Sequence, residues 1–254
     1  MPPATIPALR TVNLSKEWGA FKANSEISLS LPVGARHAII GPNGAGKTTF
    51  INLLTGVFPP TTGEVYIGEE KVTSLPQYLR VKRGMARTFQ INTLFPGLTV
   101  LESVVLAVCE RRGVTNNVVR TVARRRDEID EAMGILDSLQ LTRDADSITR
   151  NLAYGRQRLV EIALALATRP KILLMDEPAA GIPSSESKEL FAVIAKLPRD
   201  VTILFIEHDM GLVFRFAERI TVLVSGRLLV EGTPEEIAAD KRVKEVYLGE
   251  AQHD

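Results

Sequence analysis

Cysteine and long hydrophobic runs are both scarce in this sequence. Cys109 is the only cysteine among 254 residues, so no intramolecular disulfide can form, and this favours a reducing compartment. No apolar run approaches the roughly 18 residues that a membrane-spanning helix needs. The opening MPPATIPALR lacks a positively charged segment followed by an apolar one, so we expect no secretory signal. These absences indicate a soluble chain.

An excess of charge of one sign is missing as well. The chain has 31 lysines and arginines against 30 aspartates and glutamates, so its net charge of +1 predicts no general attraction to nucleic acid. Apolar residues make up 45% of the chain, which allows a sizeable core in one large domain or two small ones. Neither His37 nor His253 has a cysteine partner, so we expect no zinc site.

Apolar runs and helical patterns alternate along most of the chain. After polar and apolar alternation over residues 8–31, runs typical of strands lie at 35–40, 63–68, 171–176 and 201–208. Helical patterns lie at 47–56, near 185–197 and near 210–218. From about residue 92 to residue 150 the strand runs vanish and charged helical patterns replace them, which predicts an inserted helical subdomain. The alternation elsewhere predicts an α/β fold with a mostly parallel, buried sheet.

Two local signals lie near the C-terminus. The pair Ser225-Gly226 separates two apolar runs, which predicts a β-hairpin. Thr233 and Glu236 stand three positions apart around Pro234, a spacing that predicts a helix start with a capping box.

A glycine-rich motif follows the apolar run at 35–40. GPNGAGKT (41–48) fits the pattern G-x-x-x-x-G-K-[ST], with a strand before it and a helix after it. The glycines let backbone N–H groups turn around a phosphate, Lys47 can reach the β and γ phosphates, and Thr48 offers Mg²⁺ a hydroxyl. The expected nucleotide contacts are Gly41, Pro42, Asn43, Gly44, Ala45, Gly46, Lys47, Thr48 and Thr49. The alternative is a glycine-rich turn with a surface lysine.

Two further apolar runs end in polar residues. KILLMD (171–176) brings Asp176 and Glu177 to the carboxyl end of a buried strand, where ligands collect in open α/β sheets. Asp176 is placed there to hold Mg²⁺ and Glu177 to orient or deprotonate water, which phosphoryl transfer requires. His208 follows another such run and can contact a γ-phosphate and hold Glu177. The alternatives are a solvated acidic pair opening a turn and a structural histidine.

A second anion-binding element is predicted by NLAYGRQRLVEIALAL (151–166). A glycine-containing turn leads there into an apolar helix. Helix N-termini attract anions because their first N–H groups are unpaired and the helix dipole is positive there. The residues alone do not identify the anion.

Basic residues cluster in the predicted helical subdomain. Arg111 and Arg112 are adjacent, and a second cluster lies in ARRRDE (123–128). Both fit a solvated helix face, and both also fit attraction to anionic lipid headgroups.

These motifs, in this order and over nearly the whole chain, resemble the nucleotide-binding subunit of ATP-binding-cassette (ABC) transporters. The resemblance implies a core with a phosphate-binding loop, a mostly parallel sheet, an N-terminal antiparallel β portion and an inserted helical subdomain. It implies one ATPase domain over residues 1–254, with its core at 1–90 and 158–254 and the helical subdomain at about 91–157. ATP and Mg²⁺ are the implied ligands.

The resemblance also assigns roles to residues. Gln90 in RTFQ matches the family's glutamine that contacts Mg²⁺ and water, and Trp18 in KEWGA matches an aromatic residue that stacks on adenine. The alternative for Trp18 is a partly exposed core residue. The catalytic set expected on this basis is Lys47, Gln90, Glu177 and His208, and the expected metal contacts are Thr48, Gln90 and Asp176.

The turn LAYGR (152–156) occupies the place of the family's Leu-Ser-Gly-Gly-Gln signature. Two such subunits enclose two ATP molecules head to tail, so this helix start is expected to face the γ-phosphate of ATP on another subunit. Ala153, Tyr154 and Gly155 are the expected nucleotide contacts, and Gly155 is expected to allow close approach.

Four positions depart from the family pattern. Ala153 lacks the usual serine hydroxyl, Tyr154 replaces a glycine, and Arg156 replaces a glutamine. Pro183 replaces a carboxylate that couples the two ATP sites. We therefore expect the signature of this chain to work less well than its own phosphate-binding site.

Longer stretches resemble one ATPase subunit of importers for branched-chain amino acids, urea or amides. These stretches include GMARTFQINTLFPGLTVLESV and the tail EGTPEEIAADKRVKEVYLGE. The resemblance implies transmembrane permeases, a second ATPase (a paralogue or another copy) and, indirectly, a periplasmic or extracellular solute-binding protein as partners, with no nucleic acid. It implies a peripheral location on the cytoplasmic face of the inner membrane. The alternatives are an exporter ATPase, such as that of lipopolysaccharide export, and a soluble ABC ATPase without a transport role.

Overall fold

Buried strands and the helices between them fall into two units along the chain. The computed structural model describes residues 6–88, 95–114 and 125–250. Unit 1 comprises the chain up to residue 85, residues 171–178 and the chain from 198 onward, and unit 2 comprises residues 86–170 and 179–197. Unit 2 is longer than the helical subdomain that we expected at about 91–157. Two segments make most of the difference: the helix that begins at Tyr154 continues unbroken to Ala167, and residues 179–197 with a further helix also belong to this unit.

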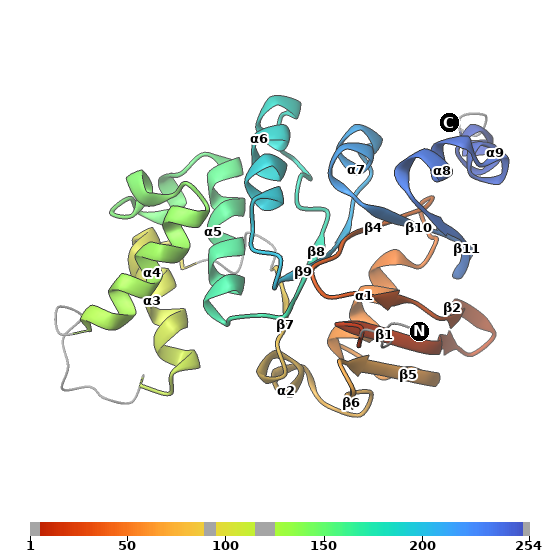
Figure 1. Ribbon diagram of the computed structural model, residues 1–254, viewed down its shortest axis with the longest axis horizontal. Helices are drawn as coiled ribbons and strands as arrows, with labels where there is room; N and C mark the ends of the chain where they lie inside the picture. The colour runs from red at the N-terminus through yellow and green to blue at the C-terminus, as the bar shows by residue number, and fades with distance from the viewer. Residues whose placement is uncertain (1–5, 89–94, 115–124, 251–254) are drawn as a thin grey trace. The chain divides into compact units, whose positions relative to one another are not determined.

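A six-stranded sheet has the order β11-β10-β4-β9-β8-β7 (Figure 1). Its strands are β4 Arg36–Ile40, β7 Met85–Arg87, β8 Ile172–Asp176, β9 Thr202–Ile206, β10 Arg219–Val224 and β11 Arg227–Gly232, with β7 at the boundary between the units. β4 pairs in parallel with β9 and β10, and β9 pairs in parallel with β8. The central strands β4 and β9 are buried along their whole length. The prediction of a mostly parallel, buried sheet is confirmed.

A second sheet in unit 1 is antiparallel. It contains β1 Leu9–Trp18, β2 Phe21–Ile27, β3 Ser30–Leu31, β5 Thr62–Ile67 and β6 Glu70–Lys71. Its order is β2-β1-β5-β6, with β3 paired to β1, and each pairing is antiparallel. This sheet confirms the expected antiparallel portion near the N-terminus.

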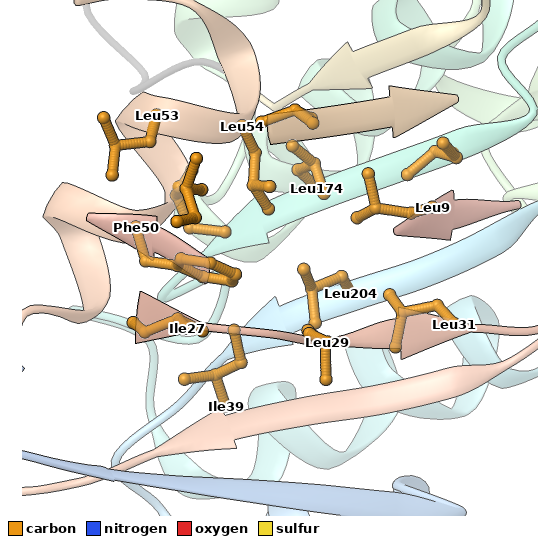
Figure 2. Packing of buried hydrophobic residues seen from close by; sticks show 14 of the residues in the cluster. Leu9, Ile27, Leu29, Leu31, Ile39, Phe50, Leu53, Leu54, Leu174 and Leu204 are labelled. Carbon is orange, nitrogen blue, oxygen red and sulfur yellow. The ribbon is translucent and has the colours of Figure 1, made fainter. Parts of the chain in front are cut away.

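Helix α1 (Lys47–Thr55) lies in the core of unit 1. Figure 2 shows its Phe50 and Leu54 packed among Leu174 of β8, Leu204 of β9 and Ile27 of β2, all of them buried. Burial of each such side chain is worth about 2 kcal/mol, so the core holds α1 firmly behind the glycine-rich loop. The other helices of unit 1 are α2 Gln77–Lys82, α7 Met210–Phe216, α8 Pro234–Ala239 and α9 Lys241–Glu250.

The two local signals near the C-terminus are confirmed. Ser225 and Gly226 both have positive φ values, 47° and 76°, as a tight hairpin between β10 and β11 requires. Thr233 accepts a hydrogen bond from the Glu236 backbone N–H, and the Glu236 carboxylate accepts one from the Thr233 N–H. This capping box starts α8.

Unit 2 is helical. Its elements are α3 Val100–Arg111, α4 Arg126–Ser138, the short 3₁₀ helices η3 Thr142–Asp144 and η4 Thr149–Asn151, α5 Tyr154–Ala167 and α6 Ser184–Ala195 (Figure 1). Arg111 and Arg112 each lie 2.6 Å from a carboxylate oxygen of Glu131, so these two arginines tie α3 to α4. Residues 123 and 124 of the other basic run lie outside the described residues. Within the described chain, none of the helices combines the length and apolar character needed to span a bilayer.

His37 is a buried residue of β4. Its Nε2 lies 2.7 Å from the Thr221 hydroxyl of β10, so the ring links two neighbouring strands. Burial lowers the pKa of His37 to about 4, with a smaller contribution from Arg219, and the ring is therefore neutral near pH 7. His253 lies outside the described residues.

Arg80 of α2 closes the C-terminal end of α1. The guanidinium is buried and donates to the carbonyls of Leu53, Leu75 and Thr73 at 2.7, 2.9 and 2.7 Å. It also donates to the Leu54 carbonyl. Two of these acceptors belong to the last turn of α1, where carbonyls lack intrahelical partners and the helix dipole is negative. Burial lowers the pKa of Arg80 to about 10, so the side chain stays charged at neutral pH.

Replacing Arg80 with methionine nearly keeps the side-chain volume but removes the guanidinium N–H groups that donate to these carbonyls. We expect Arg80→Met to lower the free energy of unfolding by about 3 kcal/mol, because buried acceptors would lose charged hydrogen bonds. Urea denaturation measures this loss. Lys82→Met is the matched control, since Lys82 is an exposed cation of the same helix and its loss should change stability by under about 0.5 kcal/mol. Equal losses in both variants would contradict the role of Arg80.

Candidate active site

The glycine-rich loop lies between β4 and α1, and its shape requires glycine. A Cβ on Gly41 would lie 2.1 Å from the Leu223 carbonyl oxygen, and one on Gly46 would lie 2.4 Å from the Ala23 carbonyl oxygen. Gly46 also has φ +93°, a left-handed conformation that disfavours side chains. The buried Asn24 amide donates to the Gly46 carbonyl at 3.1 Å. The loop is therefore held in one shape by backbone packing from β2 and β10.

Lys47 begins α1 and reaches back over this loop. Its Nζ donates to the carbonyls of Gly41 at 2.7 Å and Pro42 at 3.0 Å, and the residue is buried. The ammonium group therefore lies in the concavity of the loop, together with the positive end of α1. A phosphate seated there would meet a fixed cation and backbone N–H groups.

Glu177 and His208 lie together where β8 and β9 end. The Glu177 Oε1 and His208 Nε2 atoms are 2.7 Å apart, and both side chains are partly exposed. Glu177 has φ +51°, which costs a non-glycine residue on the order of 1 kcal/mol or more. Its backbone N–H donates to the Ile206 carbonyl at 3.0 Å. The strained backbone turns this carboxylate toward His208 instead of continuing the strand.

One cleft of about 270 Å³ in unit 1 joins the loop to this pair. The residues that line it are Phe21, Ala23, Asn43, Gly44, Ala45, Gly46, Lys47, Thr48, Thr49, Glu177 and His208. Gly41 and Pro42 contact the lysine that lines the cleft, and Asp176 stands one residue before Glu177. The cleft thus brings the expected residues of the loop, with Thr48, to the expected pair Glu177 and His208, whereas Asp176 is not among the residues that line it. Gln90 lies outside the described residues.

Trp18 ends β1, but it does not line this cleft. Its ring meets Phe58 edge to face, with the centroids 5.4 Å apart, and the Lys16 ammonium lies 5.3 Å from the Trp18 centroid. Phe21, which pairs with Trp18 across the β1–β2 hairpin, lines the cleft and is 64% exposed. Sequence reasoning missed Phe21. The available signal was a second aromatic residue in the same short hairpin as Trp18.

The predicted second anion-binding element lies in unit 2, where α5 begins at Tyr154. Ala153 is its N-cap and provides no side-chain hydrogen bond, so the N–H groups of the first turn have no capping side chain. Arg156 turns away to form an ion pair with Asp144, with Nε 2.9 Å from the carboxylate, and donates to the Gln140 carbonyl at 2.6 Å. Pro183 is the N-cap of α6 and likewise offers no side-chain hydrogen bond.

A metal ion would find only part of its ligand set in the protein. No group of three or more His, Cys, Asp or Glu side chains within the described residues is arranged to hold a metal. Thr48 and Asp176 offer a hydroxyl and a carboxylate, and Mg²⁺ commonly takes one or two protein ligands plus phosphate oxygens and water. The donor set therefore fits Mg²⁺ that arrives with a nucleotide. A phosphate loop, a strand-end carboxylate and a partnered histidine define a nucleoside-triphosphate hydrolase.

Comparison with known proteins gives the family. The profile of the family described as ABC transporter matches residues 24–180, and that of the branched-chain amino acid ATP-binding cassette transporter matches residues 227–253. The chain is 41% identical to the high-affinity branched-chain amino acid transport ATP-binding protein LivG of Salmonella typhimurium, over 96% of this chain and 99% of that protein. It is 40% identical to BraF of Pseudomonas aeruginosa, with the same coverage.

Solved structures agree. The ADP conformation of MJ1267, an ATP-binding cassette of an ABC transporter, aligns with a TM-score of 0.84 and 32% identity, over 96% of this chain and 100% of that one. The dimeric cassette MJ0796 aligns with a TM-score of 0.73 and 29% identity, over 89% and 98%. The chain belongs to the ABC transporter family and is an ATP-binding ATPase subunit.

Glu177→Gln tests the strand-end carboxylate. The amide keeps the shape of the side chain but cannot accept a proton, so we expect ATP turnover to fall by about 10²–10⁴-fold while ATP still binds. Steady-state phosphate release and nucleotide titration measure the two quantities. Glu69→Gln, an exposed change in the same unit, is the control and should turn over normally. Wild-type turnover in Glu177→Gln would mean that another group handles the attacking water.

Lys47→Ala tests the phosphate cradle. We expect the affinity for ATP to fall at least about tenfold, because the variant loses the cation that lies over the loop. Calorimetric titration with Mg-ATP measures the affinity, and Lys82→Ala serves as the matched control. An unchanged affinity would contradict the assignment of this loop.

Proposed function

We propose that this chain is the ATP-hydrolysing subunit of an importer for branched-chain amino acids or a related small polar solute. The observation that carries the proposal is the 41% identity to a branched-chain amino acid transport ATPase over 96% of the chain. The C-terminal match at residues 227–253 supports it, because that match extends beyond the general cassette at 24–180.

Hydrolysis in this proposal depends on placement more than on covalent chemistry. Lys47 and the loop N–H groups hold the β and γ phosphates, and Thr48, Asp176 and Gln90 would hold Mg²⁺. The metal would neutralise charge on the phosphate oxygens. Glu177 orients the attacking water and accepts its proton. His208, 2.7 Å from Glu177, keeps that carboxylate in place and contacts the γ-phosphate.

The adenine ring needs an apolar wall beside the phosphate cradle. We propose that Trp18 stacks on the base, and that Phe21 adds a second aromatic surface because it lines the cleft. Trp18 keeps its edge contact with Phe58 beside that surface.

The working assembly in this proposal contains two ATPase subunits, two permeases and, indirectly, a solute-binding protein outside the membrane. Each ATP lies between the phosphate loop of one ATPase and the α5 N-terminus of the other, so Ala153, Tyr154 and Gly155 serve the partner's nucleotide. Two cassettes in a dimer, as in MJ0796, support this arrangement. The chain then sits peripherally on the cytoplasmic face of the membrane, bound through the permeases.

Purification of the tagged chain from its own membranes in mild detergent tests the assembly. We expect mass spectrometry to find two permeases and a second ATPase, and cells that lack the chain to lose uptake of labelled leucine. Permeases without a second ATPase would mean that two copies of this chain pair. An untagged strain controls for adventitious capture. Ribosomal or DNA-repair partners without any membrane protein would overturn the transport role and leave the ATPase chemistry intact.

A further inference from the structure

Three side chains on one face of α5 are linked from the start of the helix to its buried interior. Tyr154, Arg158 and Glu161 stand four and three positions apart, so they stack along the helix. Arg158 Nη1 donates to Glu161 Oε2 at 3.0 Å. Arg158 Nη2 lies 3.4 Å from the Tyr154 hydroxyl, and its guanidinium lies 5.3 Å from the Tyr154 ring centroid. The series therefore runs from a buried carboxylate to an exposed aromatic ring.

The buried end of this series is an ion pair with two unsatisfied polar atoms. The Glu161 and Arg158 side chains are 2% and 11% exposed. Glu161 Oε1 and Arg158 Nε have no hydrogen-bond partner within the described chain. Burial raises the pKa of Glu161 to about 7, and Arg158 only partly offsets this. A buried ion pair with unsatisfied atoms is often no more stabilising than apolar packing, which directs attention to the geometry that it imposes.

The exposed end of the series faces a loop that leads into the next helix. Gly181 has φ +76°, and a Cβ there would lie 3.5 Å from Tyr154 Cε1 and 3.6 Å from its hydroxyl. The tyrosine ring therefore faces Gly181, at the distance at which it would touch a Cβ placed there. The same loop contains a turn in which the Ile182 N–H donates to the Ala179 carbonyl at 3.1 Å. Both segments belong to unit 2.

We propose that Arg158 and Glu161 are positioning residues that hold the Tyr154 ring against the loop at Gly181. They thereby fix the first turn of α5 and the 179–183 loop as one surface. This inference rests on the proposed function, in which that surface meets ATP bound to the other ATPase subunit. Ala153 provides no side-chain cap, so no N-cap side chain helps to fix how the helix begins.

Hydrogen exchange on the isolated chain tests the positioning directly. We expect Arg158→Met to speed exchange at the Ile182 amide at least tenfold, because the ring no longer covers the loop. Arg158→Met in a Glu161→Gln background should do the same without leaving a buried charge, which separates positioning from misfolding. Arg150→Met is the control, since Arg150 is an exposed arginine of the same unit. Unchanged exchange at Ile182 in both Arg158 variants would overturn the proposal.

Turnover by the chain as it purifies with its partners supplies the functional readout. We expect Arg158→Met to lower kcat about tenfold with KM for Mg-ATP within twofold, since the chain's own phosphate loop is untouched. Arg158→Lys, which keeps a cation beside the ring, should recover most of the loss. Tyr154→Ala should lower kcat similarly, and the double variant Tyr154→Ala/Arg158→Met should be no slower than the slower single variant.

Independent, multiplying losses in the double variant would overturn the proposal, because Arg158 would then act apart from Tyr154. A raised KM with unchanged kcat would also overturn it. Failure of the proposed function has a different signature: the purification finds no permease, while hydrogen exchange at Ile182 still responds to Arg158.

Discussion

The active site depends on parallel pairing among three buried strands. β9 pairs with β4 on one side and with β8 on the other, and Asp176 stands opposite Ile206 in that register. Because parallel strands end at the same edge, the segments that follow them emerge side by side. The phosphate loop follows β4, Glu177 follows β8 and His208 follows β9 closely. A slip of one residue would turn the strand-end side chains to the other face of the sheet.

Buried polar side chains at both ends of α1 help to fix the phosphate cradle relative to the sheet. Asn24 holds the loop at the N-terminal end of α1 through the Gly46 carbonyl, and Arg80 closes the C-terminal end. Arg80 lies where the last carbonyls of α1 lack intrahelical partners, whereas the Gly46 carbonyl that Asn24 contacts also accepts from the Phe50 N–H at 2.9 Å. Burial strengthens the hydrogen bonds of both groups. The apolar core fixes where the helix lies, and these polar contacts fix its two ends. Lys47 is consequently presented to a phosphate with little freedom left to lose on binding.

The sequence predicts those parts of the structure that local pattern controls. Apolar periodicity predicts β4, β8, β9 and α1 well, since burial alone decides them. The capping box at Thr233 is likewise predicted by the local spacing of Thr233 and Glu236. The contact between Trp18 and Phe58 and the buried position of Arg80 could not be foreseen, because each joins segments far apart in the chain. An arginine in a short polar helix gives no sign that it ends another helix. Phe21 was missed because an exposed aromatic residue leaves no periodicity, and its place in the same short hairpin as Trp18 was the only signal available.

In the proposed function, the two units supply complementary chemistry for one reaction. Unit 1 offers a cation, a carboxylate and a histidine, whereas unit 2 offers a helix N-terminus whose one charged first-turn side chain, Arg156, is paired with Asp144. A serine at the N-cap would bind the helix's own N–H groups when no nucleotide is present. Ala153 has no side-chain oxygen that could bind them, so the N–H groups of the first turn remain available for an anion. The same position also offers the anion no hydroxyl group. Attraction then depends on the backbone and the helix dipole alone, which act over a short range. A binding surface of that kind needs an accurately placed first turn. In this chain Tyr154 begins that turn, and its ring faces the loop at Gly181.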